Sequence, residues 1–204
     1  MSATIETGKG GRMNRRALVR ALLRDRGGLL VIGGLGAPAW DITAAGDVPE
    51  NLPLWGGMGG AAMMGLGLAL AQPSRCVLVI TGDGEMLMGI GSLATIAVQK
   101  PPNLSVVVQD NERYGETGMQ ETHTGHGVDL SGMARAAGIA DSRFITEAGD
   151  VPALREAIHA GRGPLFAQVK IDDAPEPLVL PPRETAILQA RMREAILGPA
   201  AHLQ

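Results

Sequence analysis

The sequence predicts an α/β protein with three layers, in which helices cover both faces of a mostly parallel central sheet. Short runs rich in Val, Ile and Leu recur along the 204 residues, and such runs are typical of strands buried on both faces. Stretches with apolar residues at helical spacing separate them. Hydrophobic residues make up 45% of the chain and aromatic residues only 2%, which predicts an aliphatic core. The length fits one domain of ordinary size.

The first half of the chain alternates between predicted helices and strands. A helix is expected at 13–26, and it should end at the glycine pair that follows because glycine commonly terminates helices. The remaining elements of this half are a strand at 29–32, a short helix at 40–45, a turn at 47–53, a helix of small residues at 61–71 and a strand at 76–80.

The second half continues the alternation and ends in an appendage. It contains an expected helix at 85–100, a strand at 104–108, a polar loop at 112–127, a helix at 130–137, a strand at 143–146, a helix at 151–160 and a strand at 165–171. A Pro-rich link at 175–182 leads to a last helix at 183–197. We therefore expect a disordered leader at 1–12, one domain at 13–174, and the link with its helix at 175–204.

Charge and composition exclude several classes of function. A net charge of −3 gives no electrostatic basis for binding nucleic acid. The apolar stretch at 57–71 is shorter than the roughly 20 residues needed to cross a bilayer, and the first residues do not read as a signal peptide. Cys76 is the only cysteine, so we expect a buried thiol and no disulfide within the chain. Together these features predict a cytoplasmic protein. Six arginines near the start of the chain should form a solvated face of the first helix: Arg12, Arg15, Arg16, Arg20, Arg24 and Arg26.

Polar residues follow two neighbouring strands at the points where they end. Gly82, Asp83 and Gly84 come after the strand at 76–80, and Asn111 comes after the strand at 104–108. Parallel strands joined by a helix place these ends on one edge of the sheet, where ligands of α/β proteins bind. Carboxylate and carboxamide oxygens suit a hard divalent cation, and glycines let the main chain approach an anion. The helix expected from Glu85 would add free N–H groups. The sequence thus predicts a metal–diphosphate site.

Gly82-Asp83-Gly84 followed by Asn111 resembles the thiamine diphosphate (ThDP) motif, which begins GDG and ends in Asn. In that family the Asp, the Asn and a main-chain carbonyl two residues further on hold Mg²⁺ against the diphosphate. The resemblance implies ThDP and Mg²⁺ as cofactors, a ThDP-binding fold of the diphosphate-binding (PP) type, and Asp83, Asn111 and the carbonyl of Arg113 as metal ligands.

Glu85 departs from the family, in which a small or hydroxyl residue often follows GDG. A carboxylate beside a diphosphate is repulsive unless it points away or meets a cation. We therefore expect the main-chain amides of Gly84 and Glu85 to bind phosphate, and not the Glu85 side chain.

The segment from Trp55 to Gly60 admits two interpretations. From the residues alone, its glycines allow the following helix to pack closely on the sheet. It also resembles the W-G-x-Φ-G segment of ThDP enzymes, in which Φ is a large apolar residue that supports the bent cofactor. The resemblance implies that Met58 supports the cofactor, while the Gly56 carbonyl and the Met58 N–H bind the aminopyrimidine ring.

The loop after Asn111 is long and polar, as functional loops often are. Its Tyr-x-x-Thr-Gly-x-Gln sequence from Tyr114 is similar to the corresponding loop of sulfopyruvate and phosphonopyruvate decarboxylases, although Met119 and Glu121 replace a Gly and a Pro that are common there. The resemblance implies that Tyr114 and Gly115 line the cofactor site. His123 is either an exposed loop residue or a proton shuttle in the pocket.

One element of the ThDP site is missing from this sequence. ThDP requires a Glu that protonates its pyrimidine, and in the family this Glu lies on a separate pyrimidine-binding domain. The sequence matches only the diphosphate-binding half, most closely the β subunit of sulfopyruvate decarboxylase and the corresponding half of phosphonopyruvate decarboxylase. The resemblance implies an α subunit as partner, in an α₂β₂ or larger assembly, and a small anionic 2-oxoacid as substrate, with Arg113 or His123 near its anionic tail.

Three functions remain open on this evidence. The first is a decarboxylase that releases an aldehyde and CO₂. The second is a ThDP-dependent carboligase or 2-oxoacid oxidoreductase, similar to acetolactate synthase. The third is a non-catalytic module that retains the fold.

Overall fold

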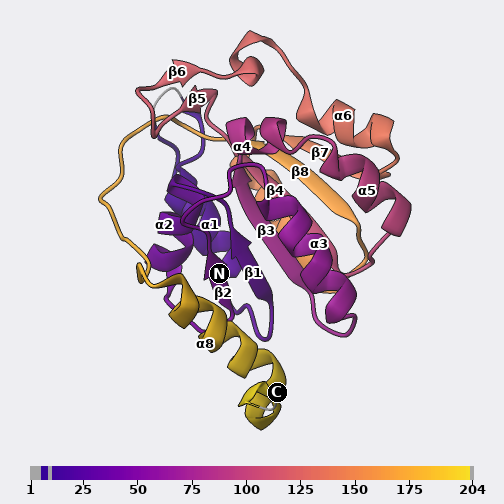
Figure 1. The fold of residues 1–204 in the computed structure, drawn as a ribbon. Helices are drawn as coiled ribbons and strands as arrows, with labels where there is room; N and C mark the ends of the chain where they lie inside the picture. The colour runs from indigo at the N-terminus through magenta and orange to yellow at the C-terminus, as the bar shows by residue number, and fades with distance from the viewer. Residues whose placement is uncertain (1–5, 9–10, 203–204) are drawn as a thin grey trace.

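A computed structural model describes residues 6–8 and 11–202 (Figure 1). A six-stranded sheet with the order β2-β1-β3-β4-β8-β7 forms its centre, and every pairing in this sheet is parallel. The fold class is confirmed. Its strands are β1 (Leu30–Gly33), β2 (Asn51–Pro53), β3 (Val77–Gly82), β4 (Leu104–Asp110), β7 (Asp141–Ile145) and β8 (Leu165–Lys170), and a separate hairpin pairs β5 (Arg113–Tyr114) with β6 (Gln120–Glu121).

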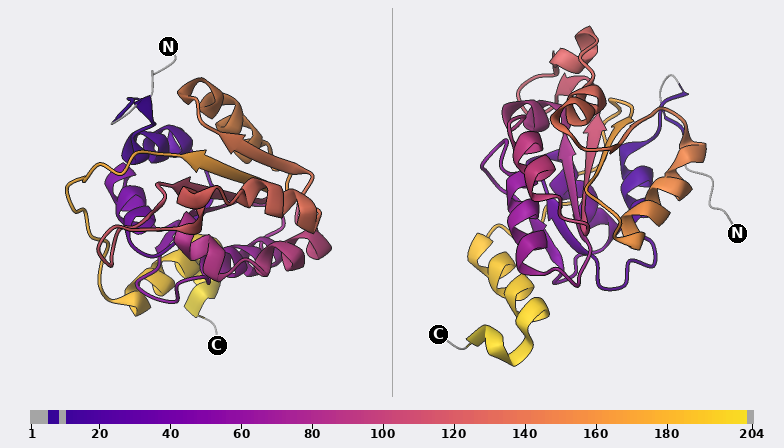
Figure 2. Two further views of the ribbon diagram at one scale, coloured as in Figure 1. Left: turned by 90° about the horizontal axis from the view of Figure 1, so that it is seen from above. Right: turned by 90° about the vertical axis from the view of Figure 1, so that its right-hand side faces the viewer.

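Helices cover both faces of the sheet, as the views in Figure 2 show. Helices α1 (Arg15–Leu23), α2 (Ala37–Ala45) and α7 (Val151–Ala160) pack on one face, and α3 (Ala61–Ala71), α5 (Ser92–Gln99) and α6 (Leu130–Ala137) pack on the other. The remaining helices are α4 (Asp83–Met88), α8 (Thr185–Leu197) and the short 3₁₀ segments His123–His126, Ala148–Asp150 and Gly198–His202.

The strands alternate between two hydrophobic cores, which explains their continuous apolar runs. In β3, Leu78 and Ile80 face the core beneath α1, α2 and α7, while Val77 and Val79 face the core beneath α3, α5 and α6. A strand buried on both faces needs apolar side chains at every position. The β3–β4 register pairs Gly82 with Gln109, so the two strands end side by side.

Several elements differ from the sequence-based predictions. The turn expected at 47–53 contains β2, an edge strand too short to show a periodic pattern. Helix α2 begins at Ala37, with a proline in its first turn, where proline is tolerated. The helix expected at 85–100 is two helices, α4 and α5. They part at Gly89, where a β-carbon would lie only 2.2 Å from the Gly59 oxygen.

The first helix is shorter than expected, and its arginines form the expected solvated face only in part: Arg20 and Arg24 are exposed, but Arg15 and Arg16 are buried. Helix α1 ends at Leu23, before the glycine pair. Arg15 and Arg16 are only 7% and 8% exposed, because both form ion pairs with the buried Asp41 of α2. Arg26 is also largely withdrawn from water, and this burial lowers its pKa to about 10.

The C-terminal helix packs on its own domain. Leu188 and Met192 of α8 are buried, and α8 contacts β2 at the edge of the sheet. The link preceding α8 is attached as well, since the Trp55 Nε1–H donates to the Pro182 oxygen at 2.8 Å.

Parts of the predicted leader lie outside the described residues, namely 1–5 and 9–10. Thr7 forms a bridge with Met13, and Met13 forms one with Ile171 next to β8. Cys76 directly precedes β3 and is partly buried, where burial raises the pKa of its thiol. Within the described part of the chain, no helix is both long and apolar enough to cross a membrane.

Candidate functional site

A cavity of about 350 Å³ opens at the carboxyl ends of the strands, where the sequence predicted a site. It reaches from one helical layer to the other: Arg15 and Pro38 line it from α1 and α2, and Met58 and Met88 line it from the α3 side. Most of the predicted site residues lie in its wall: Met58, Gly82, Asp83, Gly84, Glu85, Asn111, Arg113, Tyr114 and Gly115.

The GDG turn forms an open edge of this cavity. Strand β3 ends at Gly82, and α4 begins at the next residue. A β-carbon at Gly82 would meet no atom of the described chain within 4 Å, whereas one at Gly84 would lie 2.3 Å from the Tyr114 ring. Glycine at 84 therefore lets the tyrosine of the β5–β6 hairpin pack directly on the turn.

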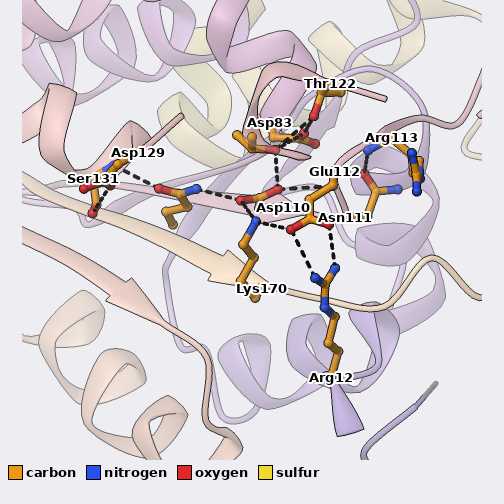
Figure 3. A network of polar contacts seen from close by, with 12 residues as sticks. Arg12, Asp83, Asp110, Asn111, Glu112, Arg113, Thr122, Asp129, Ser131 and Lys170 are labelled. Atoms are coloured by element: carbon orange, nitrogen blue, oxygen red, sulfur yellow. Dashed lines mark hydrogen bonds and ion pairs between the residues drawn. The ribbon is translucent and has the colours of Figure 1, made fainter. Parts of the chain in front are cut away.

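Asp83 is buried and held by two threonines (Figure 3). Its Oδ2 accepts hydrogen bonds from the hydroxyls of Thr122 and Thr124, the latter at 2.9 Å. The Thr124 Oγ1 also lies 2.7 Å from an oxygen of Asp110. Burial raises the pKa of Asp83, and the neighbouring Asp110 adds to the rise while the threonine hydrogen bonds oppose it.

Asp110 has the cationic partner that Asp83 lacks. The Lys170 Nζ lies 2.8 Å from Asp110 and 2.7 Å from Glu112, and Arg12 pairs with Glu112 at 3.1 Å. Figure 3 shows these groups in a line leading from Asp83 to the N-terminal segment. No ion pair within the described residues neutralises Asp83, so one buried carboxylate at the cavity is left without a counter-ion.

Asn111 and Arg113 adopt a turn beside Asp83. The Asn111 Oδ1 accepts the Arg113 N–H at 3.0 Å, and one lone pair of this oxygen stays available. The Arg113 guanidinium points to Glu121 at 2.7 Å on the other strand of the hairpin.

The donor set fits a hard divalent cation. No group of three His, Cys, Asp or Glu side chains in the described residues is arranged to hold a metal, so a cation here would rely on Asp83, the Asn111 amide oxygen and main-chain carbonyls. Mg²⁺ is commonly bound by one or two carboxylates together with ligand phosphates. A cation would also neutralise the unpaired charge of Asp83.

Glu85 is turned into the protein. Its carboxylate, only 4% exposed, accepts hydrogen bonds from the Thr81 hydroxyl at 2.8 Å, the Leu35 N–H at 3.0 Å and the Ala61 N–H at 3.4 Å. It therefore joins β3, the β1–α2 loop and the start of α3. Burial raises the pKa of Glu85, whereas these hydrogen bonds act to lower it.

Two predicted site residues lie outside the cavity wall. Gly56 is exposed in the segment before α3 and does not line the cavity, although Met58, two residues on, does. His123 is exposed at the start of the 3₁₀ helix and does not line the cavity either. Their predicted roles remain predictions.

Among the cavity residues that the sequence-based interpretation did not assign to the site, three carry a charged or amide side chain: Arg15, Gln109 and Glu116. Gln109 sits in β4 directly before the Asp110–Asn111 pair, so its place at the strand end could have flagged it. Arg15 belonged to a run of arginines without a visible partner, since Asp41 lies 26 residues away.

Comparison with known proteins identifies the family. The profile of the thiamine pyrophosphate enzyme C-terminal TPP binding domain matches residues 43–169, more than half of the chain. The chain belongs to the thiamine pyrophosphate enzymes. Thiamine pyrophosphate is another name for ThDP, so the family predicted from the GDG motif is confirmed.

Two relatives of this thiamine pyrophosphate enzyme, and the solved structure of a further protein, are informative. It is 40% identical over 142 residues to sulfopyruvate decarboxylase subunit beta of Methanothermobacter thermautotrophicus, covering 70% of this chain and 73% of the relative. It is 33% identical over 190 residues to phosphonopyruvate decarboxylase of Streptomyces viridochromogenes, covering 91% of this chain but 46% of that relative. Benzoylformate decarboxylase from Polynucleobacter necessarius superposes with a TM-score of 0.70 at 18% identity, over 87% of this chain and 36% of that one. This last similarity concerns the fold.

Proposed function

We propose that this thiamine pyrophosphate enzyme is the ThDP- and Mg²⁺-binding subunit of a heteromeric decarboxylase, which converts a small anionic 2-oxoacid into an aldehyde and CO₂. The observation that carries the proposal is the cavity at the sheet edge, which gathers Asp83, Asn111 and the hairpin from Arg113. The names of the relatives support the reaction and point to sulfopyruvate- or phosphonopyruvate-like substrates.

Each residue of the site has an assigned binding role. Asp83, Asn111 and the Arg113 carbonyl bind Mg²⁺, and the main chain of Gly82, Gly84 and Glu85 surrounds the diphosphate. Gly56 and Met58 contact the organic part, and Tyr114 and Gly115 close the site from the hairpin. When bound, ThDP supplies a carbon nucleophile and accepts the electrons released as CO₂ leaves.

The proposal requires a partner subunit with a pyrimidine-binding domain, in an α₂β₂ or larger assembly. Of the three cavity carboxylates, Asp83 is assigned to the metal, Glu85 is already engaged by three donors and Glu116 lies on the exposed hairpin turn. The activating Glu is therefore expected from the partner, in agreement with the description of the Methanothermobacter relative as a beta subunit.

Calorimetric titration of ThDP with Mg²⁺ tests this function, using the chain alone and the chain with the pyrimidine-domain subunit. We expect binding in the pair, no binding in the chain alone, and loss of binding in Asp83→Ala. The pair should also release an aldehyde and CO₂ from sulfopyruvate or phosphonopyruvate. Turnover by the isolated chain would contradict the heteromer, and absence of binding in both samples would contradict the ThDP site.

A further inference from the structure

One positively charged side chain of the cavity wall has no part in the proposed metal site. Arg15, at the start of α1, lines the cavity wall opposite Met58 and Met88. It is almost fully buried, and a buried charge is costly unless an anion compensates it. Its surroundings therefore indicate whether an anion is missing from this end of the cavity.

Among the described residues, Arg15 has one ion-pair partner, Asp41, which it shares with a second arginine. The Arg15 Nη1 donates to Asp41 Oδ1 at 2.5 Å, and the Arg16 Nε donates to the same oxygen at 3.2 Å. Two guanidinium groups thus meet one carboxylate. The other Asp41 oxygen accepts from the Gln109 Nε2 at 3.4 Å, and this amide also donates to the Arg15 main-chain oxygen at 3.3 Å. Gln109 therefore fixes the first turn of α1 against the end of β4.

Arg15 and Arg16 differ in the partners of their remaining N–H donors. Arg16 donates through Nη2 to the Pro177 oxygen at 2.7 Å, and its Nη1 lies 3.6 Å from Glu176. For Arg15, no hydrogen bond within the described residues engages Nε or Nη2. Arg16 therefore has a second carboxylate and a main-chain acceptor, whereas Arg15, which lines the cavity, keeps two donors that no described residue engages.

Glu116, another residue of the cavity wall, is close enough to Arg15 for the two charges to interact. The Arg15 guanidinium tends to lower the pKa of Glu116, but burial outweighs it and raises that pKa overall. Glu116 lies on the exposed turn of the β5–β6 hairpin, and no hydrogen bond or ion pair joins it to Arg15 in the described chain. Glu116 therefore leaves the two free donors of Arg15 unoccupied.

We propose that Arg15 binds the terminal phosphate of the ThDP diphosphate, with its guanidinium held by Asp41, which in turn accepts a hydrogen bond from Gln109. This inference rests on the proposed function and adds a phosphate contact from α1. Met58, Asp83 and Arg15 all line the cavity, and Gln109, which bonds to the Arg15 main chain, pairs in register with Gly82 beside Asp83. The cavity thus offers an apolar side chain, the proposed metal ligand and a guanidinium, which suits a ligand with an organic part, a metal-bound part and an anionic end. Planar guanidinium groups bind phosphate oxygens in pairs, so the two free donors suit this role.

Thiamine monophosphate, which lacks the terminal phosphate, provides the test. ThDP and thiamine monophosphate are each titrated with saturating Mg²⁺ into the chain assembled with its pyrimidine-domain subunit, as wild type, Arg15→Met, Arg15→Lys and Arg16→Met. Arg16→Met is the matched control, because Arg16 binds the same Asp41 oxygen but does not line the cavity.

Arg15→Met should weaken ThDP binding by about 10- to 100-fold and change thiamine monophosphate binding by less than about twofold. Arg15→Lys, which keeps the charge and is expected to fold like wild type, should fall between wild type and Arg15→Met. Arg16→Met should preserve the wild-type preference for ThDP.

Equal losses for both ligands in Arg15→Met, or unchanged ThDP binding in both Arg15 variants, would overturn the inference while leaving the proposed function intact. Unchanged ThDP binding with a raised KM for the 2-oxoacid would assign Arg15 to the substrate's anionic tail instead. A wild-type pair that binds no ThDP would refute the proposed function, and this inference with it.

Discussion

At the scale of single residues, the proposed metal ligand Asp83 depends on side chains that never face the ligand. Thr122 and Thr124 occupy its Oδ2, so the other oxygen is the one left to bind a cation. Such supporting contacts fix the orientation of a ligand before the metal arrives, and their loss commonly lowers metal affinity.

Replacing Thr124 should therefore weaken metal binding without touching a ligand. Thr124→Val removes the hydroxyl that lies between Asp83 and Asp110, and we expect Mg²⁺-dependent ThDP affinity to fall by about 10- to 100-fold. Thr124→Ser retains the hydroxyl and serves as the control, with affinity close to wild type. The measurement is a Mg²⁺ titration at saturating ThDP in the assembled pair. Equal behaviour of the two variants would show that the hydroxyl has no such role.

Single residues also show which parts of the site could be predicted from the sequence. Asp83 and Asn111 were predictable because they follow β-branched runs directly, and strand ends of a parallel sheet share an edge. Arg15 was misassigned because its burial depends on Asp41, and a sequence pattern does not reveal a partner on another helix. The orientation of Glu85 was only partly predictable, because its partners Leu35 and Ala61 are distant in the chain.

At the scale of elements, α6 follows the hairpin and is capped by a charged residue. The Asp129 Oδ1 accepts the Gly132 N–H at 2.8 Å and the Ser131 hydroxyl at 2.6 Å. These hydrogen bonds, first that of Ser131 and then that of Gly132, lower the pKa of Asp129. They stabilise the ionised carboxylate at the helix N-terminus, where negative charge is favourable.

Asp129→Ala should reduce the free energy of unfolding by about 1 kcal/mol at neutral pH. Because folding lowers the pKa of Asp129, its charge-dependent contribution is present above the ordinary aspartate value and is lost as the pH falls through the lowered folded value. The difference from wild type should therefore shrink at strongly acidic pH. Chemical denaturation at both pH values measures it, and Asp129→Asn, which retains a capping oxygen, is the control. A difference that stays constant with pH would argue against the charged cap.

Elements differ in how well a sequence pattern reveals them. The buried strands β3 and β4 were found because every position must be apolar. Strand β2 was missed because three residues that include Asn51 and Pro53 carry no periodicity, and its place is set by pairing with β1. The break between α4 and α5 depends on contact between Gly89 and Gly59, a long-range approach that helical spacing does not encode.

At the scale of the whole molecule, α8 is part of the domain and not a free appendage. Leu188 is 1% exposed, whereas its neighbour Ile187 is 52% exposed. Only the folded structure shows which of these two adjacent apolar residues is buried.

Leu188→Ala should destabilise the domain by about 2–5 kcal/mol, as expected for a cavity in a packed interface. Ile187→Ala, on the same helix, should change the stability by less than about 0.5 kcal/mol. Denaturation followed by circular dichroism compares the two variants, and a single transition would show that α8 unfolds together with the sheet. Equal stabilities would mean that α8 does not stabilise the domain.

The hydrogen bond from Trp55 to Pro182 has a practical consequence for spectroscopy. The chain has two tryptophans, and Trp55 lies three residues before Met58, in contact with the link to α8. With Trp40→Phe, the remaining indole becomes a single native fluorophore positioned between the C-terminal link and the cavity wall. Its emission would report on both at once, without any attached dye.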